Sequence, residues 1–91
     1  MAHCPYEKLK DLEPAFVEIR KLEKIKEPKP GIFYLKSQGF LHFHIKADKI
    51  WADARAGQEW GSPIDIPPKV TKTFLKKFVC EIKSRHELSL S

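Results

Sequence analysis

The residues best able to do chemistry stand at alternate positions in two short segments near the middle of the chain. The first segment holds two histidines, and the second holds an indole, a carboxylate and a guanidinium: His42, His44, Trp51, Asp53 and Arg55. Alternate residues of a β-strand point to the same face. If both segments are strands, these side chains therefore share one surface.

A hairpin brings the two segments together. With Lys46 to Lys49 as the connection, counting outward sets His44 opposite Trp51 and His42 opposite Asp53. A carboxylate beside an imidazole favours the charged form and fixes the tautomer, which is how many general bases are built. Such pairs are also ordinary on a solvated sheet face, so the sequence leaves a catalytic and a non-catalytic interpretation open.

Two aromatic residues complete the candidate binding patch. The same register sets Phe40 opposite Arg55, and Trp60 belongs to a segment, 57–68, with two glycines and three prolines. We interpret that segment as a flexible loop that lets Trp60 close over the patch as a lid. The candidate binding residues are therefore His42, His44, Trp51, Asp53, Arg55 and Trp60.

A metal site on the same patch is the next alternative. Histidines at i and i+2 of a strand can both ligate zinc, with Asp53 as a third ligand. The sequence has no second histidine cluster and no CxxC pair. We therefore expect no bound metal and no cofactor.

The surrounding segments predict an α+β fold. Residues 14–26 and residues 70–86 carry apolar side chains at helical spacing, and a Pro-Lys-Pro-Gly run at 28–31 ends the first helix. Three segments between them, rich in β-branched and aromatic residues, predict strands: 32–36, 40–45 and 50–55. With a short edge strand at 64–66, we expect a three- to four-stranded antiparallel meander, packed on one face by the N-terminal and C-terminal helices.

The other face of the hairpin is the candidate core, with large and small apolar side chains: Leu41, Phe43, Ile45, Ile50, Ala52 and Ala54. The register of the first strand depends on its turn. A two-residue turn at Gln38-Gly39 sets Tyr34 opposite Phe43, and a three-residue turn sets Phe33 there. Either register adds apolar residues to the face that carries the histidines, so we expect a homodimer that covers them.

Length and composition bound the class of protein. The chain has 91 residues, which suits a single domain over residues 1–91. Its two cysteines, Cys4 and Cys80, are too few for a disulfide framework and indicate free thiols in a reducing compartment. No segment resembles a signal peptide or approaches the roughly 18 apolar residues of a membrane span. We expect a cytoplasmic protein without a membrane partner.

The formal net charge of +5 permits a nucleic-acid partner. Four lysines on or before the last helix can contact phosphates, with Arg85 at the end of their row: Lys69, Lys72, Lys76 and Lys83. The sequence shows no helix-turn-helix and no RNP-like or KH-like motif. A solvated helix face explains the same lysines, so nucleic acid stays an alternative partner.

Three segments resemble a family of small, uncharacterised bacterial proteins: GIFYLKS from Gly31, FLHFH from Phe40 and IWADAR from Ile50. The resemblance covers the central third of the chain. It implies a bacterial source and a compact protein, and it carries no known activity and no functional residue.

Three functions from different classes follow. The first is a non-enzymatic binding or interaction domain that uses the His42–Arg55 patch for a ligand or protein partner. The second is a small hydrolase-like enzyme with the His42–Asp53 pair as base at a dimer interface, and the third is a nucleic-acid-associated protein. We favour the first, because a domain of this size seldom encloses a deep catalytic pocket.

Overall fold

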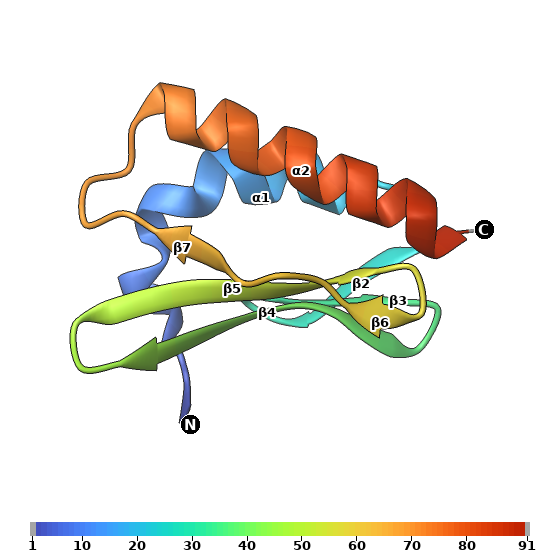
Figure 1. Cartoon of the computed structure of the whole chain (residues 1–91), viewed down its shortest axis with the longest axis horizontal. Coiled ribbons are helices and arrows are strands. Elements are labelled where there is room, and N and C mark those ends of the chain that lie inside the picture. Colours follow the sequence, from blue (N-terminus) through green and yellow to red (C-terminus); the bar gives the residue numbers. More distant parts are fainter. Residues whose placement is uncertain (1, 91) are drawn as a thin grey trace.

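The computed structural model describes residues 2–90 and places both helices on one face of an antiparallel sheet (Figure 1). This confirms the α+β class and the packing of the two helices. The sheet has more strands than expected, because seven strands pair within the described residues. Five form the meander β2-β3-β4-β5-β6, while β1 pairs with β4 and β7 with β5. Their bounds are β1 Ala2–His3, β2 Ile25–Lys29, β3 Ile32–Leu35, β4 Gln38–Lys46, β5 Lys49–Ala56, β6 Glu59–Trp60 and β7 Ile64–Ile66.

The two helices are α1, Glu13–Arg20, and α2, Lys72–Leu90, and two short 3-10 turns precede α1. Pro14 lies in the first turn of α1, where its missing N–H has no helical partner. The Thr71 hydroxyl accepts a hydrogen bond from the Phe74 amide at 3.1 Å. This N-cap explains why α2 begins at Lys72, two residues later than the sequence pattern predicts.

The prediction that the first helix continues to Lys26 was wrong. The helix ends at Arg20, and Lys24 adopts a left-handed conformation with φ 63°. Ile25 then pairs with Leu35, so the chain continues as a strand instead of a helix. Strand β2 tolerates Pro28 because it lies at the outside of the sheet, where one missing N–H costs no ladder bond.

A chain of polar contacts fastens α1 to β2. Arg20 pairs through Nε with Glu27 Oε1 and through Nη1 with Glu13 Oε1, both at 2.6 Å. Glu27 also accepts a hydrogen bond from the Gly31 amide at 3.0 Å, and the Tyr6 hydroxyl donates to Glu13. The hydrogen bond from Arg20 lowers the pKa of Glu13, and Tyr6 adds to the effect. These tertiary contacts stabilise β2, and local sequence patterns do not predict them.

The turn between β3 and β4 lies earlier than either register had assumed. Lys36 and Ser37 form it with φ 54° and 79°, and positive φ at both central residues is typical of a type I′ hairpin turn. Phe33 therefore pairs with Leu41 and Tyr34 with Gly39, so both predicted registers were wrong.

A register shift between these two pairs leaves Phe40 as an extra residue in β4. A bulge of this kind turns the strand locally, and Phe40 is fully buried with its ring 6.1 Å from that of His86. The expectation that Phe40 lies beside Arg55 on the histidine face was therefore wrong.

The β4–β5 register agrees with the prediction at every pair from Leu41–Ala54 to Ile45–Ile50. The face toward the helices forms the core, in which Phe43 is 2% exposed. The Phe43 ring lies 5.5 Å from that of Phe16 on α1 and 6.1 Å from that of Phe78 on α2. One aromatic ring on the hairpin thus contacts both helices.

We predict that Phe43→Ala lowers the free energy of unfolding by about 3–5 kcal/mol, because the ring leaves a cavity that neither helix can fill without losing its other contacts. Urea denaturation followed by circular dichroism measures the change. Val17→Ala, on the exposed side of α1, is the control and should change stability by less than about 0.5 kcal/mol. A loss below about 1 kcal/mol for Phe43→Ala would show that this ring is not part of the core.

Candidate functional site on the open face of the sheet

The face of the sheet away from the helices carries a continuous group of aromatic and imidazole rings. We call it the ring face and define it as Tyr34, His42, His44, Trp51 and Trp60, together with Asp53 and Arg55. All six candidate residues from the sequence lie on this face, because strand pairing and alternation bring them to the same side. Tyr34 also lies on this face. The alternative with a three-residue turn after the first predicted strand had placed it there, although the register of that alternative was wrong.

The rings of this face contact one another across four strands. His42 lies at the centre, with ring centroids 6.3 Å from Tyr34, 6.5 Å from His44 and 5.3 Å from Trp60. The His44 ring lies 5.6 Å from that of Trp51. The surface is therefore one connected layer of rings, held on a sheet whose other side is the core.

A short polar contact on this face joins His44 and Asp53, with Nε2 and Oδ2 3.0 Å apart. Asp53 lies directly opposite His42 in the register, as the sequence predicted, and the carboxylate reaches the neighbouring histidine along the strand. The side chains of His44 and Asp53 are 14% and 27% exposed. The pair is thus partly shielded from water but accessible from the open side of the sheet.

Arg55 and Trp60 form the best-defined contact of the ring face. The guanidinium carbon of Arg55 stands 4.6 Å from the centroid of the indole, within the range of a cation–π interaction. Trp60 lies on β6 and pairs with Arg55, so the interpretation of residues 57–68 as a flexible loop with Trp60 as a lid was wrong. The strand forms because Gly57, with φ 84°, opens a tight turn after β5.

Gly39 lies where the backbone of β4 comes close to the His42 ring. A Cβ atom at this position would lie 2.8 Å from His42 Nε2 and 3.7 Å from the Trp60 indole. The Gly39 carbonyl also accepts a hydrogen bond from Arg55 Nε at 2.6 Å. The contact of that Cβ with Trp60 would be an ordinary one, whereas the His42 ring would have to move, so glycine at position 39 favours the observed place of His42.

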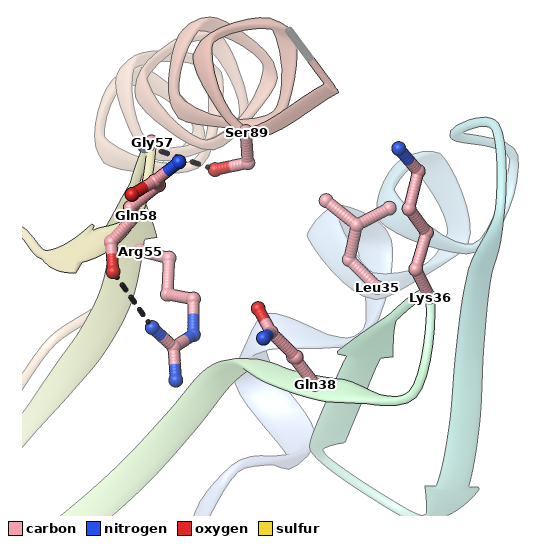
Figure 2. Close-up of a pocket in the computed structure, with 7 residues that line it drawn as sticks. All are labelled: Leu35, Lys36, Gln38, Arg55, Gly57, Gln58 and Ser89. Atoms are coloured by element: carbon pink, nitrogen blue, oxygen red, sulfur yellow. Dashed lines mark hydrogen bonds between the residues drawn. The ribbon is translucent and has the colours of Figure 1, made fainter.

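A cleft of about 470 Å³ lies beside Arg55, between the C-terminal end of α2 and the turns that follow β3 and β5 (Figure 2). Gln38 rises into it from β4, Arg55 extends from β5, and Ser89 reaches it from the end of α2. Lys36 stands on the other side of the opening, and none of the described residues that line it is acidic: Leu35, Lys36, Gln38, Arg55, Gly57, Gln58 and Ser89. Sequence reasoning missed this cleft, because three segments far apart in the chain build it.

The helix lysines and Arg85 do not form one row of cations. Lys69, Lys72, Lys76 and Lys83 are exposed, whereas Arg85 is buried at 8% exposure. Its guanidinium donates to the Ala54 and Ser62 carbonyls, each at 3.0 Å, and to Glu81 at 2.8 Å. The interpretation of Arg85 as the end of a phosphate-binding row was therefore wrong, and this side chain fastens α2 to the sheet.

His86 is a second buried polar residue on α2. Its Nε2 lies 2.7 Å from the Glu23 carbonyl oxygen. Both residues continue the buried stripe of the helix, Phe78, Ile82, Arg85 and His86, at the i, i+4, i+7 and i+8 spacing of an amphipathic helix. That spacing is the sequence signal that could have placed them inside.

Among the side chains that the structure describes, no three of histidine, cysteine, aspartate or glutamate gather into a group that could hold a metal ion. The expectation of no bound metal stays a prediction. No helix in this part of the chain has the length and apolar character needed to cross a membrane. Searches with this chain match no protein-family model, no curated protein and no solved structure.

We predict that Arg85→Met lowers the free energy of unfolding by about 1–3 kcal/mol, because the Ser62 carbonyl and the Glu81 carboxylate lose a charged donor. The exposed neighbour Lys83 provides the matched control, and Lys83→Met should change stability by less than about 0.5 kcal/mol. Chemical denaturation of both variants measures the difference. Equal effects at the two positions would contradict the structural role of Arg85.

Proposed function

We propose that this chain is a non-enzymatic binding domain that takes its ligand on the ring face. The observation that carries the proposal is the contact of Arg55 with Trp60, 4.6 Å from guanidinium carbon to ring centroid, on the side of the sheet that neither helix covers. Tryptophan, tyrosine and arginine are the residues that most often dominate the energy of recognition sites. A group that docks there meets a cation and a ring together.

Arg55 is held in place before any ligand arrives. Its Nε donates to the Gly39 carbonyl at 2.6 Å and its Nη1 to the Gln58 carbonyl at 3.1 Å. Immobilising a flexible side chain at an interface costs about 0.5–1.5 kcal/mol. A ligand that contacts Arg55 avoids much of that cost, which supports a role in recognition.

The surroundings of Arg55 indicate the chemistry of the ligand. Trp60 is 44% exposed and offers a surface on which a planar group can stack. The adjoining cleft holds Arg55 and Lys36 and no acidic residue among its described lining. A planar group that carries a carboxylate or a phosphate therefore suits this end of the ring face, with its ring on Trp60 and its anion in the cleft.

The enzyme alternative took His42 and Asp53 as the base, and the contact at 3.0 Å, the kind that a general base needs, joins Asp53 to His44. A hydrolase of the Ser–His–Asp type also needs a nucleophile beside the base. Among residues 2–90, strand pairing puts no serine, threonine or cysteine on the ring face. Binding is therefore the function that this arrangement supports better.

The open face of the sheet offers the proposed homodimer a smaller apolar surface than the sequence predicted. Phe33, Leu35 and Phe40 lie in the core, so the apolar contribution to the open face comes mainly from Ile32, Tyr34 and the two tryptophans. A second copy of the chain remains one possible occupant of the ring face, and measurement of the oligomeric state decides it.

A cytoplasmic location is part of the same proposal. Both cysteines are free thiols, with Cys4 buried and Cys80 exposed. Burial raises the pKa of the Cys4 thiol, which keeps it protonated and unreactive. An exposed free thiol such as Cys80 is stable in a reducing compartment.

We predict that planar aromatic acids, with naphthoate as the probe, shift the indole N–H resonances of Trp51 and Trp60 in ¹H–¹⁵N spectra. Both tryptophans of the chain lie on the ring face, so these two signals report its occupancy directly. Cyclohexanecarboxylate has the same charge without the aromatic ring and should bind at least fivefold more weakly, since stacking is lost.

Trp60→Leu should weaken naphthoate binding by a similar factor and leave the resonances of the core unchanged. Lys83→Met is the control on the helix side. Naphthoate that shifts only resonances of α1 and α2, or none at all, would remove the ring face as a binding site.

A further inference from the structure

We infer that the ring face binds single-stranded nucleic acid, with bases on the rings and phosphates on cations at the two ends of the β4–β5 hairpin. The inference rests on the proposed function and names the ligand of the same site. In this inference the phosphates contact cations of the β4–β5 hairpin, and not the lysines of α2 that the sequence suggested.

The first group of cations lies at the tip of the hairpin. Lys46 and Lys49 pair directly across β4 and β5, and strand alternation puts them on the same face as His44 and Trp51. Both lysines are exposed, and within residues 2–90 no ion pair joins either of them to a carboxylate. Like charges directly opposite each other destabilise a hairpin, and a phosphate between them removes that cost.

The second group lies at the other end of the same strands. Arg55 stacks on Trp60, and Lys36 stands across the adjoining cleft (Figure 2). The rings therefore lie between a lysine pair at the hairpin tip and Arg55 at the other end, while Lys36 extends toward the α2 side of the cleft (Figure 2). This charge pattern suits a nucleic-acid single strand whose phosphates contact the two ends of the ring face and whose bases stack on the rings between them.

The dimensions of the ring face fit a short oligonucleotide. From Lys49 to Arg55 the strand advances by about 20 Å at roughly 3.4 Å per residue. A stacked single strand advances about 3.4 Å per nucleotide, so this length accommodates about six nucleotides. Sites of about four to sixteen nucleotides are usual for single small domains that bind single strands.

The connected rings provide the stacking surface that single-strand binding needs. Tyr34, His42 and Trp60 form one contact series across β3, β4 and β6, and His44 on β4 and Trp51 on β5 extend it toward the hairpin tip. Bases of any identity can stack on such rings, so little sequence preference is expected. A duplex keeps its bases inside and cannot use them, so single strands should bind better.

Two carboxylates lie in the middle of the face. Asp53 is paired with His44 at 3.0 Å, and Asp65 is exposed and lies opposite Trp51 on β7. Asp53 lies two residues before Arg55 on the same face of β5, and its contact with His44 directs the carboxylate toward the middle of the face. Carboxylates accept hydrogen bonds from the exocyclic amino groups of bases, so their position is compatible with base contacts and excludes phosphates from the centre.

The test measures binding of fluorescein-labelled 12-mers, dT12 and U12, to the full chain by anisotropy, with quenching of the two tryptophans as a second readout. We expect dissociation constants between about 1 and 100 µM at about 50 mM salt, and a slope of log K against log salt of about −2, corresponding to about three phosphates. The two oligonucleotides distinguish DNA from RNA. A 12-bp duplex of the same charge density should bind at least about fivefold more weakly, because its bases cannot stack on the rings.

Two charge-reversal variants separate the ring face from the helix lysines. K46E/K49E and K76E/K83E each lower the formal net charge from +5 to +1, so they differ only in where the charge is lost. We expect a loss of affinity of at least about tenfold for the first and less than about threefold for the second. Equal losses, or a larger loss for K76E/K83E, would overturn the inference, as would a duplex that binds as well as dT12.

The outcomes also separate this inference from the proposed function. If naphthoate shifts the tryptophan resonances and neither oligonucleotide binds, the nucleic-acid inference fails and the binding face stands. If neither probe binds, both fail. A dimer mass in light scattering that K46E/K49E or Trp60→Leu converts to a monomer mass, with no oligonucleotide bound to the unmodified protein, would assign the ring face to a second copy of the chain and overturn the inference.

Discussion

The strict alternation of side chains along β4 and β5 is the constraint on which the rest of the structure depends. Phe43 faces the helices, and the next residue on either side, His42 or His44, faces away from them. A slip of the hairpin register by one residue would move Phe43 to the open side and force the polar side chains of His44 and Asp53 against the core. Burial of one ring between two helices therefore fixes the direction of every polar group on the opposite face.

The hairpin and its two faces could be predicted because residues close together in the sequence determine them. Alternation and a short connection determine the pairing, and no distant segment has to be known. The β3–β4 turn was misplaced because Lys36 and Ser37 adopt positive φ although Gly39 is the residue that takes it most easily. Strand β2 was missed for a related reason, since Lys24 turns the chain without a glycine and the partner of Ile25 lies ten residues further on.

The candidate site was predictable to the extent that it depends on the same alternation. Its five hairpin residues were found, whereas the Arg55–Trp60 contact was not, because β6 is only two residues long and its pairing has no periodic signal. Arg85 was misread because its charge suggested solvent, although its spacing from Ile82 put it on the buried stripe. Spacing therefore predicted burial better than polarity did on this helix.

The prolines limit how this protein can meet another chain. Five of its seven prolines lie in or beside two of the strands at the margins of the sheet: Pro28 and Pro30 at β2, and Pro63, Pro67 and Pro68 around β7. Proline offers no amide hydrogen, so an incoming extended segment finds few consecutive backbone donors along either margin. Strand addition, the route by which many sheets recruit peptides and by which they form fibrils, is disfavoured at both margins. Partners must then engage the broad surface of the sheet, and the same prolines should keep the protein dispersed at high concentration.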